Sequence, residues 1–545
     1  MLFDHTTAPA NRNSPHMIGS LRSRDYFLLT MFSLVLFTYS IVSGRPLTMH
    51  EARLPQTSRE MQMSRDYLFP TSGGRPWLER PPLPHWITLA VTSVVGHNDE
   101  VLFVRLPSAV LGCAIVLLTA WMASRWFGGT IGLTSGFVLA TMYELWAYSS
   151  LAEDDIYLAA LVAVAMAIFA HNEFFNERLS RDSRTNFFGT RPWQVLVVFA
   201  LIGLTNLTKG PLLGVMIAAS TIGAYQVLTA DRRRVLRYVW LWGWLLLIAL
   251  TLAWPIAAYL RYPDVLDNWR FDYLGRLGGR FLYQPPWYYL GALAMNLAPW
   301  TALSIFGLWS TRQRVRSDRV GPERFLWCWA IVPVLVFSIP QGKHHHYLLP
   351  IVAPWAIVTA IGWTHVSRAI LQARPHFKPR NALASILIVL LLGYSAGQTM
   401  FAARSEGTFE DTKFLRRVRI LIPDDLPLFI NADVGSMDFF RLQYYSRADA
   451  ILLHNLTYLR DERIRQPSAN VITRARDQSK LETLGRVQVI AQSLKSHDDG
   501  GKPEGRFTLF RLQFDPKLTR YPAPQRISAL QAMGRDEGPY CGPRL

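Results

Sequence analysis

Cysteine is scarce in this chain, whose 545 residues contain only Cys113, Cys328 and Cys541. None of the three has CxxC spacing, so the sequence supports neither a disulfide framework nor a thiolate metal site. Two of them lie inside apolar runs, where a buried small hydrophobic residue is the default. A clear internal repeat is also lacking, which counts against a transporter, because transporters are often built from such repeats.

Hydrophobic residues make up half of the chain and are gathered into runs. About 20 apolar residues cross the core of a bilayer. The flank after the first run is a poor cleavage site, so that run is predicted to be an uncleaved span. A shorter run, Trp86–Val95, is predicted to be a membrane-surface helix. About eleven spans are predicted: Tyr26–Val42, Leu106–Trp126, Ile131–Tyr148, Ile156–Phe174, Trp193–Thr208, Leu212–Leu228, Leu236–Tyr259, Trp287–Trp309, Phe325–Pro340, Tyr347–Trp363 and Leu383–Phe401.

The formal net charge of +18 could suggest a nucleic-acid partner, but the basic residues cluster between the apolar runs. That placement is typical of cytoplasmic loops in membrane proteins, so no nucleic-acid binding is predicted. If residues 1–24 are a cytoplasmic N-terminus, every loop on the inner side is basic, such as the loops that hold residues 232–234 and 312–319. The orientation follows from this alternation.

The chain is predicted to divide into a transmembrane domain, residues 25–401, and a soluble α/β domain, residues 402–545, on the outer side. Residues 44–104 form the first outer loop. The soluble domain lacks long apolar runs and its last ~25 residues, rich in Pro, Gly and Arg, are predicted to be loosely ordered. Its β-like stretches are Leu426–Asn431, Ala450–His454, Val487–Ala491 and Phe507–Phe514.

Ionisable side chains gather on the predicted outer side, although such groups are costly at membrane depth. A carboxylate there can take a proton from an acceptor hydroxyl. Cations such as Arg80, Lys209 and Lys343 can hold a phosphate and stabilise its charge as it leaves. This combination indicates group transfer from a lipid phosphate. The side chains come from five segments: His50, Glu51, Arg53, Glu79 and Arg80; Glu153, Asp154 and Asp155; Lys209; Arg270, Asp272, Arg276 and Arg280; and Lys343 to Tyr347.

Simpler explanations stay open for each of these residues. Glu51 could complement a helix dipole, and Asp154 and Asp155 could cap a span. Lys209 could extend to the interface. The three histidines 344–346 could be a solvated loop or bind a metal, although consecutive histidines cannot all point at one ion.

Several segments, in one order over about residues 45–365, carry a family resemblance: HEARLPQTSREM, GGRPWLERPPLPHW, RLPSAV, AEDDIYLAAL, LTKGP, PPWYYLGALAMNLAPW and KHHHYLLPIVAP. The chain resembles the bacterial polyprenyl-phosphate-dependent glycosyltransferases of the GT-C type, the broad group of the lipid A aminoarabinose transferase and the protein O-mannosyltransferases. The resemblance implies an α-helical polytopic protein of the bacterial inner membrane, among membrane lipids, with a periplasmic C-terminal α/β domain. It also implies inverting transfer of a sugar from a polyprenyl-phosphate donor to a lipid, glycan or protein hydroxyl on the periplasmic side. A transporter or flippase, or an inactive scaffold of the same fold, is the alternative.

The resemblance also implies roles for individual residues. His50 stands where the family usually has an aspartate, so the base is His50 or Glu51, the acceptor differs, or activity is weak. In the aminoarabinose branch a Glu-His pair precedes an arginine; here Asp272, Tyr273 and Arg276 are present and the histidine is missing. No cofactor is therefore expected, with a divalent metal still possible. The catalytic set is Glu51, Asp155 and His50, the donor-phosphate set is Arg80, Lys209, Lys343 and Tyr347, and the supporting set is Arg53, Glu79, Asp154, Arg276 and His346.

Overall fold

The structure is a computed structural model. It describes residues 20–42, 45–95, 101–176, 187–190, 192–210, 212–279, 283–404, 406–423, 426–431, 436–447, 449–453, 455–460, 467–494 and 503–518. Most of the predicted N-terminal segment 1–24, Arg280, the C-terminal tail and Cys541 lie outside these residues. Cys113 and Cys328 are buried and free.

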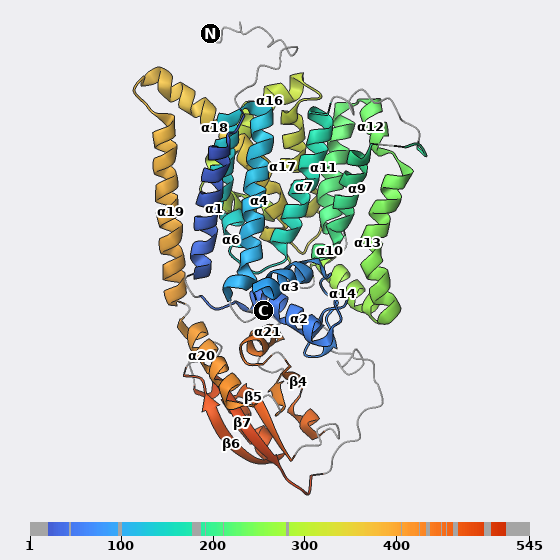
Figure 1. Cartoon of the computed structure of the whole chain (residues 1–545), viewed down its shortest axis with the longest axis vertical. Coiled ribbons are helices and arrows are strands. Elements are labelled where there is room, and N and C mark those ends of the chain that lie inside the picture. The colour runs from blue at the N-terminus through green and yellow to red at the C-terminus, as the bar shows by residue number, and fades with distance from the viewer. Residues whose placement is uncertain are drawn as a thin grey trace.

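Long helices form a bundle in the upper part of Figure 1, and their apolar side chains pack into one large core that includes Phe37, Phe169 and Trp329. Short helices connect them. The helices of the bundle are α1 (Ser23–Val42), α4 (Val101–Phe127), α5 (Gly129–Ala140), α6 (Tyr143–Tyr148), α7 (Asp155–Phe174), α9 (Trp193–Leu204), α10 (Asn206–Lys209), α11 (Leu213–Thr229), α12 (Arg232–Tyr238), α13 (Leu241–Arg261), α15 (Tyr288–Asn296), α16 (Thr301–Ser317), α17 (Pro322–Ser338), η1 (His345–Ile351), α18 (Val352–Ala373) and α19 (Pro379–Arg404).

Five of the described helices are long and apolar enough to cross a membrane: Val101–Phe127, Asp155–Phe174, Leu241–Arg261, His345–Ala373 and Pro379–Met400. The segment predicted as one span, Trp287–Trp309, is two helices, α15 and α16, bent by 105°. Pro299 lies at that break, where it cannot donate a helical hydrogen bond. Ile131–Tyr148 is likewise divided, into α5 and α6. The count of about eleven spans stays a prediction.

A layer of shorter elements closes one end of the bundle (Figure 1). It consists of α2 (Met49–Ser64), the hairpin β1 (Thr71–Ser72) and β2 (Arg75–Pro76), α3 (Leu83–Val95) and α14 (Val265–Leu277). The helix α3 contains the predicted surface segment. The helix α2 was not predicted, and it begins with a capping box in which Thr48 and Glu51 bind each other's backbone amides.

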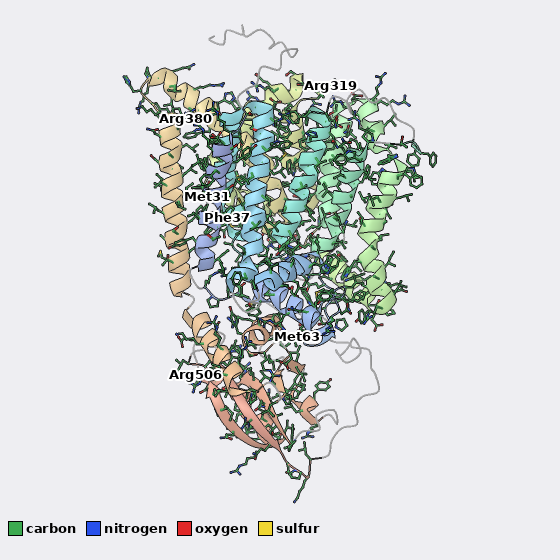
Figure 2. The ribbon with its side chains drawn as sticks, in the orientation of Figure 1. Met31, Phe37, Met63, Arg319, Arg380 and Arg506 are labelled. Carbon is green, nitrogen blue, oxygen red and sulfur yellow. The ribbon has the colours of Figure 1, made fainter. Side chains whose placement is uncertain are left out.

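The two ends of the bundle differ in the residues that lie there. Figure 2 shows Arg319 and Arg380 at the end far from the C-terminal domain, and Met63 of α2 at the end beside it. Arg319 belongs to a loop that the charge pattern assigned to the inner side, and Arg380 lies in the first turn of α19 at the same end. The predicted site segments therefore share the opposite end with α2.

The C-terminal domain contains a five-stranded sheet of order β4-β3-β5-β7-β6. β3, β4 and β5 are parallel, whereas β7 runs antiparallel to β5 and β6. Four strands match the predicted stretches, except that His454 lies outside the described residues, and β5 was not predicted. The elements are α20 (Glu406–Leu421), β3 (Leu428–Asn431), α21 (Ser436–Tyr445), β4 (Ile451–Leu453), η3 (Leu456–Arg460), β5 (Ser468–Arg474), η4 (Ala475–Asp477), α22 (Gln478–Glu482), β6 (Gly485–Gln492), η5 (Pro503–Gly505) and β7 (Phe507–Phe514). The division of the chain at residues 401/402 stays a prediction.

Candidate active site

Glu51 lies at the centre of a buried ion-pair cluster that joins three parts of the chain. Its Oε1 accepts a hydrogen bond from Arg105 Nε at 2.6 Å, and its Oε2 accepts from Arg105 Nη2 at 3.0 Å and Arg45 Nη2 at 3.2 Å. The backbone amides of Thr48 and Ala152 also donate to this carboxylate, at 3.0 and 3.3 Å. Burial alone would raise the pKa of Glu51, but Arg105 and Arg45 outweigh it and lower the pKa to about 2. Glu51 is therefore ionised, and it positions the segment before α2 against α4 and α7.

His50, next to Glu51, is held by Arg53 of the same helix. The Nη2 of Arg53 lies 2.9 Å from His50 Nδ1. A guanidinium can only donate, so Nδ1 accepts and the ring proton lies on Nε2. Partial burial and then the charge of Arg53 lower the pKa of His50 to about 4. The imidazole is therefore neutral at neutral pH and offers a donor, not an acceptor, through its second nitrogen.

Glu60, three turns further along α2, fixes the hairpin that leads to the Glu79–Arg80 motif. Its carboxylate accepts from the amides of Gly73 and Gly74 at 2.8 and 3.0 Å and from Thr71 Oγ1 at 2.9 Å. Both glycines have positive φ, 60° and 74°, which a two-residue hairpin turn requires. Two amides complete the set of donors: Gln56 Nε2 of the same helix, at 3.0 Å, and Gln443 Nε2 of α21, at 2.8 Å. The C-terminal domain therefore contacts the same carboxylate that shapes the hairpin.

Three further contacts fasten α21 to this layer. The hydroxyl of Tyr445 accepts from the amide of Leu47 at 2.7 Å, and Arg59 Nη1 donates to the carbonyl of Tyr444 at 3.1 Å. The ring of Trp77 packs edge-on against Phe440, with centroids 5.6 Å apart. The first loop is thus held between the bundle and the soluble domain.

Arg80 connects the hairpin to the turn before α7. Its Nη2 lies 3.2 Å from Glu79 Oε1 and its Nε lies 3.3 Å from Asp154 Oδ2. It also donates to the carbonyl of Lys209 at 3.5 Å. Arg276 reaches the same Glu79 carboxylate at 3.8 Å. Burial raises the pKa of Glu79, but Arg80 outweighs it, so the pKa is lowered and the carboxylate stays ionised.

A second ion pair joins Asp155, the first residue of α7, to Lys209 of α10, and both side chains are buried. Lys209 Nζ also lies 5.4 Å from the centroid of the Tyr347 ring, a cation–π arrangement. The hydroxyl of Tyr347 accepts from Arg276 Nη1 at 3.1 Å, and Arg276 Nε pairs with Asp272 at 3.0 Å. Lys209, Arg276 and Tyr347 therefore form one group although they come from three distant segments.

The three histidines do not act as one ligand set. His345 Nδ1 lies 3.3 Å from the buried carboxylate of Glu144, whereas the rings of His344 and His346 stack with centroids 5.1 Å apart. Burial, and then the charges of Arg276 and Lys209, lower the pKa of His344 to about 4. The residues that the structure describes contain no group of three or more His, Cys, Asp or Glu side chains placed to hold a metal. The expectation that no metal is required stays a prediction.

Lys343 is the predicted cation that lies apart from the others. It is buried and its Nζ donates to the carbonyl of Gln284 at 3.1 Å. This contact fastens the segment before α15 to the turn before η1. Its predicted part in phosphate binding stays a prediction.

Glu153 is an acid of the predicted outer side that belongs to none of the predicted catalytic, donor-phosphate and supporting sets. It lies in the turn before α7 and is partly exposed. Burial, and then the neighbouring Asp155, raise the pKa of Glu153 to about 7. The sequence shows only that Glu153 is one of three consecutive acids. It does not indicate which of the three pairs with a cation.

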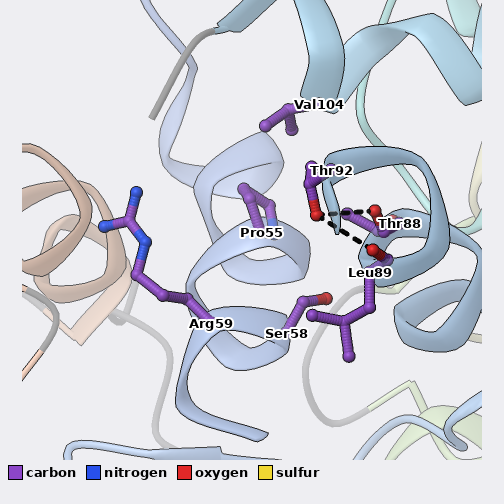
Figure 3. A pocket seen from close by; sticks show the side chains of 7 residues that line it. All are labelled: Pro55, Ser58, Arg59, Thr88, Leu89, Thr92 and Val104. Carbon is purple, nitrogen blue, oxygen red and sulfur yellow. Dashed lines mark hydrogen bonds between the residues drawn. The ribbon is translucent and has the colours of Figure 1, made fainter. Parts of the chain in front are cut away.

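A small pocket lies between α2, α3 and α4, and Arg59 is the charged residue that lines it (Figure 3). Pro55 and Ser58 of α2, Thr88 and Thr92 of α3 and Val104 of α4 contribute to its lining. The Thr92 hydroxyl donates to the Thr88 and Leu89 carbonyls of its own helix. The lining includes none of the predicted site residues, so the pocket reflects packing of α2 on α3 and α4.

Comparisons with known proteins agree with this architecture. The family model "Dolichyl-phosphate-mannose-protein mannosyltransferase" matches residues 79–259. The undecaprenyl phosphate-alpha-4-amino-4-deoxy-L-arabinose arabinosyl transferase 1 of Sodalis glossinidius is 28% identical over 356 residues, 63% of this chain and 60% of that protein. The corresponding transferase of Pseudomonas aeruginosa is 28% identical over 60% of this chain and 58% of its own length. The match therefore spans less than two thirds of these relatives.

Solved structures extend the likeness to most of the chain. ArnT from Cupriavidus metallidurans bound to undecaprenyl phosphate superposes with a TM-score of 0.71, covering 89% of this chain and 97% of that one at 16% identity. The archaeal oligosaccharyltransferase of Archaeoglobus fulgidus gives a TM-score of 0.53 over 88% of this chain and 74% of that one, at 10% identity. With the apolar helices, the bacterial arabinosyl transferases named above indicate a multi-pass bacterial membrane protein. The chain therefore resembles the polyprenyl-phosphate-dependent GT-C glycosyltransferases in sequence and has the fold of the aminoarabinose transferase ArnT.

Proposed function

We propose that this chain is an inverting membrane glycosyltransferase that moves a sugar from a polyprenyl-phosphate donor to a hydroxyl of a lipid, glycan or protein. The observation that carries the proposal is the convergence of Arg80, Lys209 and Arg276, with the Tyr347 hydroxyl, at the end of the bundle. Three cations at one level suit a phosphate whose chain lies in the bilayer and whose charge grows as the sugar leaves. The names of the relatives agree with such a donor.

The residues divide into two roles in this proposal. Arg80, Lys209, Arg276 and Tyr347 bind the donor phosphate, with Arg80 able to do so through two parallel hydrogen bonds. The carboxylates that pair with these cations hold them in place until the phosphate arrives. Glu51, which is fully paired and buried, acts as a positioning residue that sets α2 beside the reacting groups.

The proposed location is the bacterial inner membrane, with the site and the C-terminal domain on the periplasmic side. The basic loops at the far end of the bundle support it, because Lys and Arg are enriched in cytoplasmic loops. Arg319 lies in one of these loops, and Arg380 lies at the start of α19 at the same end (Figure 2).

The test uses full-length protein in nanodiscs and a panel of undecaprenyl-phosphate sugars, with transfer to lipid A, glycan and protein acceptors followed by mass spectrometry. We expect transfer from at least one donor, and a loss of roughly 100-fold or more in Arg80→Ala, since one charged contact to a developing oxyanion contributes about that much. Arg319→Ala, at the other end of the bundle, is the matched control and should transfer like the wild type. Absence of transfer from every donor, or equal rates in both variants, would contradict the proposal.

A further inference from the structure

Glu153 differs from the other carboxylates of this site in lacking a bonded cation among the described residues. Glu51 is held by Arg105, Glu79 and Asp154 by Arg80, Asp155 by Lys209 and Asp272 by Arg276. A carboxylate that is committed to a cation is a weak proton acceptor, because the cation stabilises its ionised form. Glu153 is also partly exposed, so a substrate can reach it.

The turn that carries Glu153 is fixed on both sides. Before it, the amide of Ala152 donates to Glu51 at 3.3 Å. After it, Asp154 and Asp155 are bound by Arg80 and Lys209. The titratable and charged groups that face the Glu153 carboxylate are Arg45 and Glu51, Arg53 of α2, Tyr148 of α6, Asp155 of α7, Lys209 of α10 and His345 of η1.

We propose that Glu153 is the general base of the transfer reaction, an inference that rests on the proposed function. The acceptor hydroxyl oxygen forms a bond to the anomeric carbon of the sugar while the bond from that carbon to the phosphate oxygen breaks. The electron pair of the broken bond leaves with the polyprenyl phosphate, and the hydroxyl proton passes to the Glu153 carboxylate. Arg80 and Lys209, which flank the turn, meet the charge that develops on the phosphate.

The other candidates for this proton are less suitable. His50 receives a hydrogen bond from Arg53 on Nδ1 and carries its proton on Nε2, so neither nitrogen is free to accept. Glu51 is fully buried and receives five hydrogen bonds. We therefore assign to Glu153, in the turn before α7, the role of the carboxylate that is missing at position 50 in α2.

The environment of Glu153 also suits a base that works near neutral pH. Burial and the charge of Asp155 outweigh the attraction of Arg53 and Lys209 and raise the pKa of Glu153 to about 7. A base is most effective when its pKa lies near the working pH. Because the acting form is the ionised one, turnover should rise with pH through about 7.

The test compares wild type, Glu153→Gln and Asp267→Asn in nanodiscs, with the undecaprenyl-phosphate sugar that gives the fastest wild-type transfer. Asp267 is an exposed acid of α14 at the same end of the molecule and serves as the matched control. We expect Glu153→Gln to lose about 100-fold or more in kcat, within the range typical of a missing general base. Its dissociation constant for undecaprenyl phosphate should stay within about twofold of wild type, and the rise in kcat near pH 7 should disappear.

The outcomes separate the two proposals. If wild type transfers sugar and Glu153→Gln does so within about threefold, or with the same pH profile, the general-base assignment is wrong and the proposed function stands. If Glu153→Gln loses donor binding as strongly as it loses rate, Glu153 has a structural role and the assignment is also wrong. If wild type transfers nothing from any donor, the proposed function fails and this inference fails with it.

Discussion

Replacing Glu51 with glutamine should destabilise the protein, because the substitution leaves Arg105 without its counter-charge. The Arg105 side chain is completely buried, and two of its nitrogens bind the Glu51 carboxylate. Breaking a buried ion pair from one side typically costs about 3–5 kcal/mol. A glutamine would also turn an amide donor towards a guanidinium that can only donate. We therefore expect Glu51→Gln to lower the free energy of unfolding by about that amount.

The assay is thermal and denaturant unfolding of purified protein in one detergent, without substrate. The matched control is Glu410→Gln, which breaks the Glu410–Lys413 pair on α20, where the lysine side chain is 71% exposed. Such a surface pair contributes about 0–1 kcal/mol. The double variant Glu51→Gln, Arg105→Met should recover part of the loss, because it removes the unpaired charge. If Glu51→Gln unfolds like wild type while losing activity, Glu51 acts in the chemistry itself and the positioning role is refuted.

Three further predictions concern pH, the domain contact and metals. The pKa of Glu51 falls from 4.5 to about 2 on folding, so the carboxylate contributes about 3 kcal/mol of stability above pH 4.5. That contribution should be lost as pH falls through about 2, which acid unfolding of wild type and Glu51→Gln will test. Tyr445→Phe leaves the buried amide of Leu47 without an acceptor and should lower the free energy of unfolding by about 1–3 kcal/mol. Hydrogen exchange at the Leu47 amide should then be faster, and an unchanged exchange rate would contradict the contact. Transfer activity should persist in excess chelator, and complete loss that a divalent ion restores would overturn the expectation of no required metal.

Most helices of the membrane bundle could be predicted, because a long apolar run in the sequence indicates a membrane span whatever the side chains contact. Leu383–Phe401 lies within α19 (Pro379–Arg404), and Ile156–Phe174 falls one residue short of α7. Breaks were harder to place. The bend between α15 and α16 lies inside an apolar run, so hydropathy continues across it.

The elements that sequence reasoning missed are those whose polar residues find partners elsewhere. α2 contains Pro55 and many charged residues, which together suggest a loop, yet it begins with a Thr48–Glu51 capping box that the sequence does display. Strand β5 contains Asn470 and Thr473, which depart from the apolar pattern of a central strand. Thr473 is bound by Asn431 and Asp477, at 3.0 and 2.7 Å, and these contacts exist only in the folded sheet.

The candidate site was predictable as a set of residue types on one side, but not as a set of pairs. The segments predicted to lie on the outer side carry acids and bases, yet spacing could not say that Asp155 meets Lys209 while Glu153 meets no cation among the described residues. Pairing depends on three-dimensional distances between α7, α10 and the hairpin. For the same reason Lys343, one predicted phosphate ligand, is found against Gln284.

The contact between Glu60 and Gln443 has a consequence for the order in which the protein matures. The two residues are 383 positions apart in the chain, and chains generally fold from the N-terminus during synthesis. The ribosome therefore releases the hairpin that leads to Arg80, and the Glu60 carboxylate that binds it, long before it has synthesised Gln443. The newly made membrane bundle passes through a stage in which α2 lacks its contacts with α21. The hairpin acquires all of its contacts only when the C-terminal domain has folded, so an incomplete chain holds Glu79 and Arg80 less firmly than a finished one.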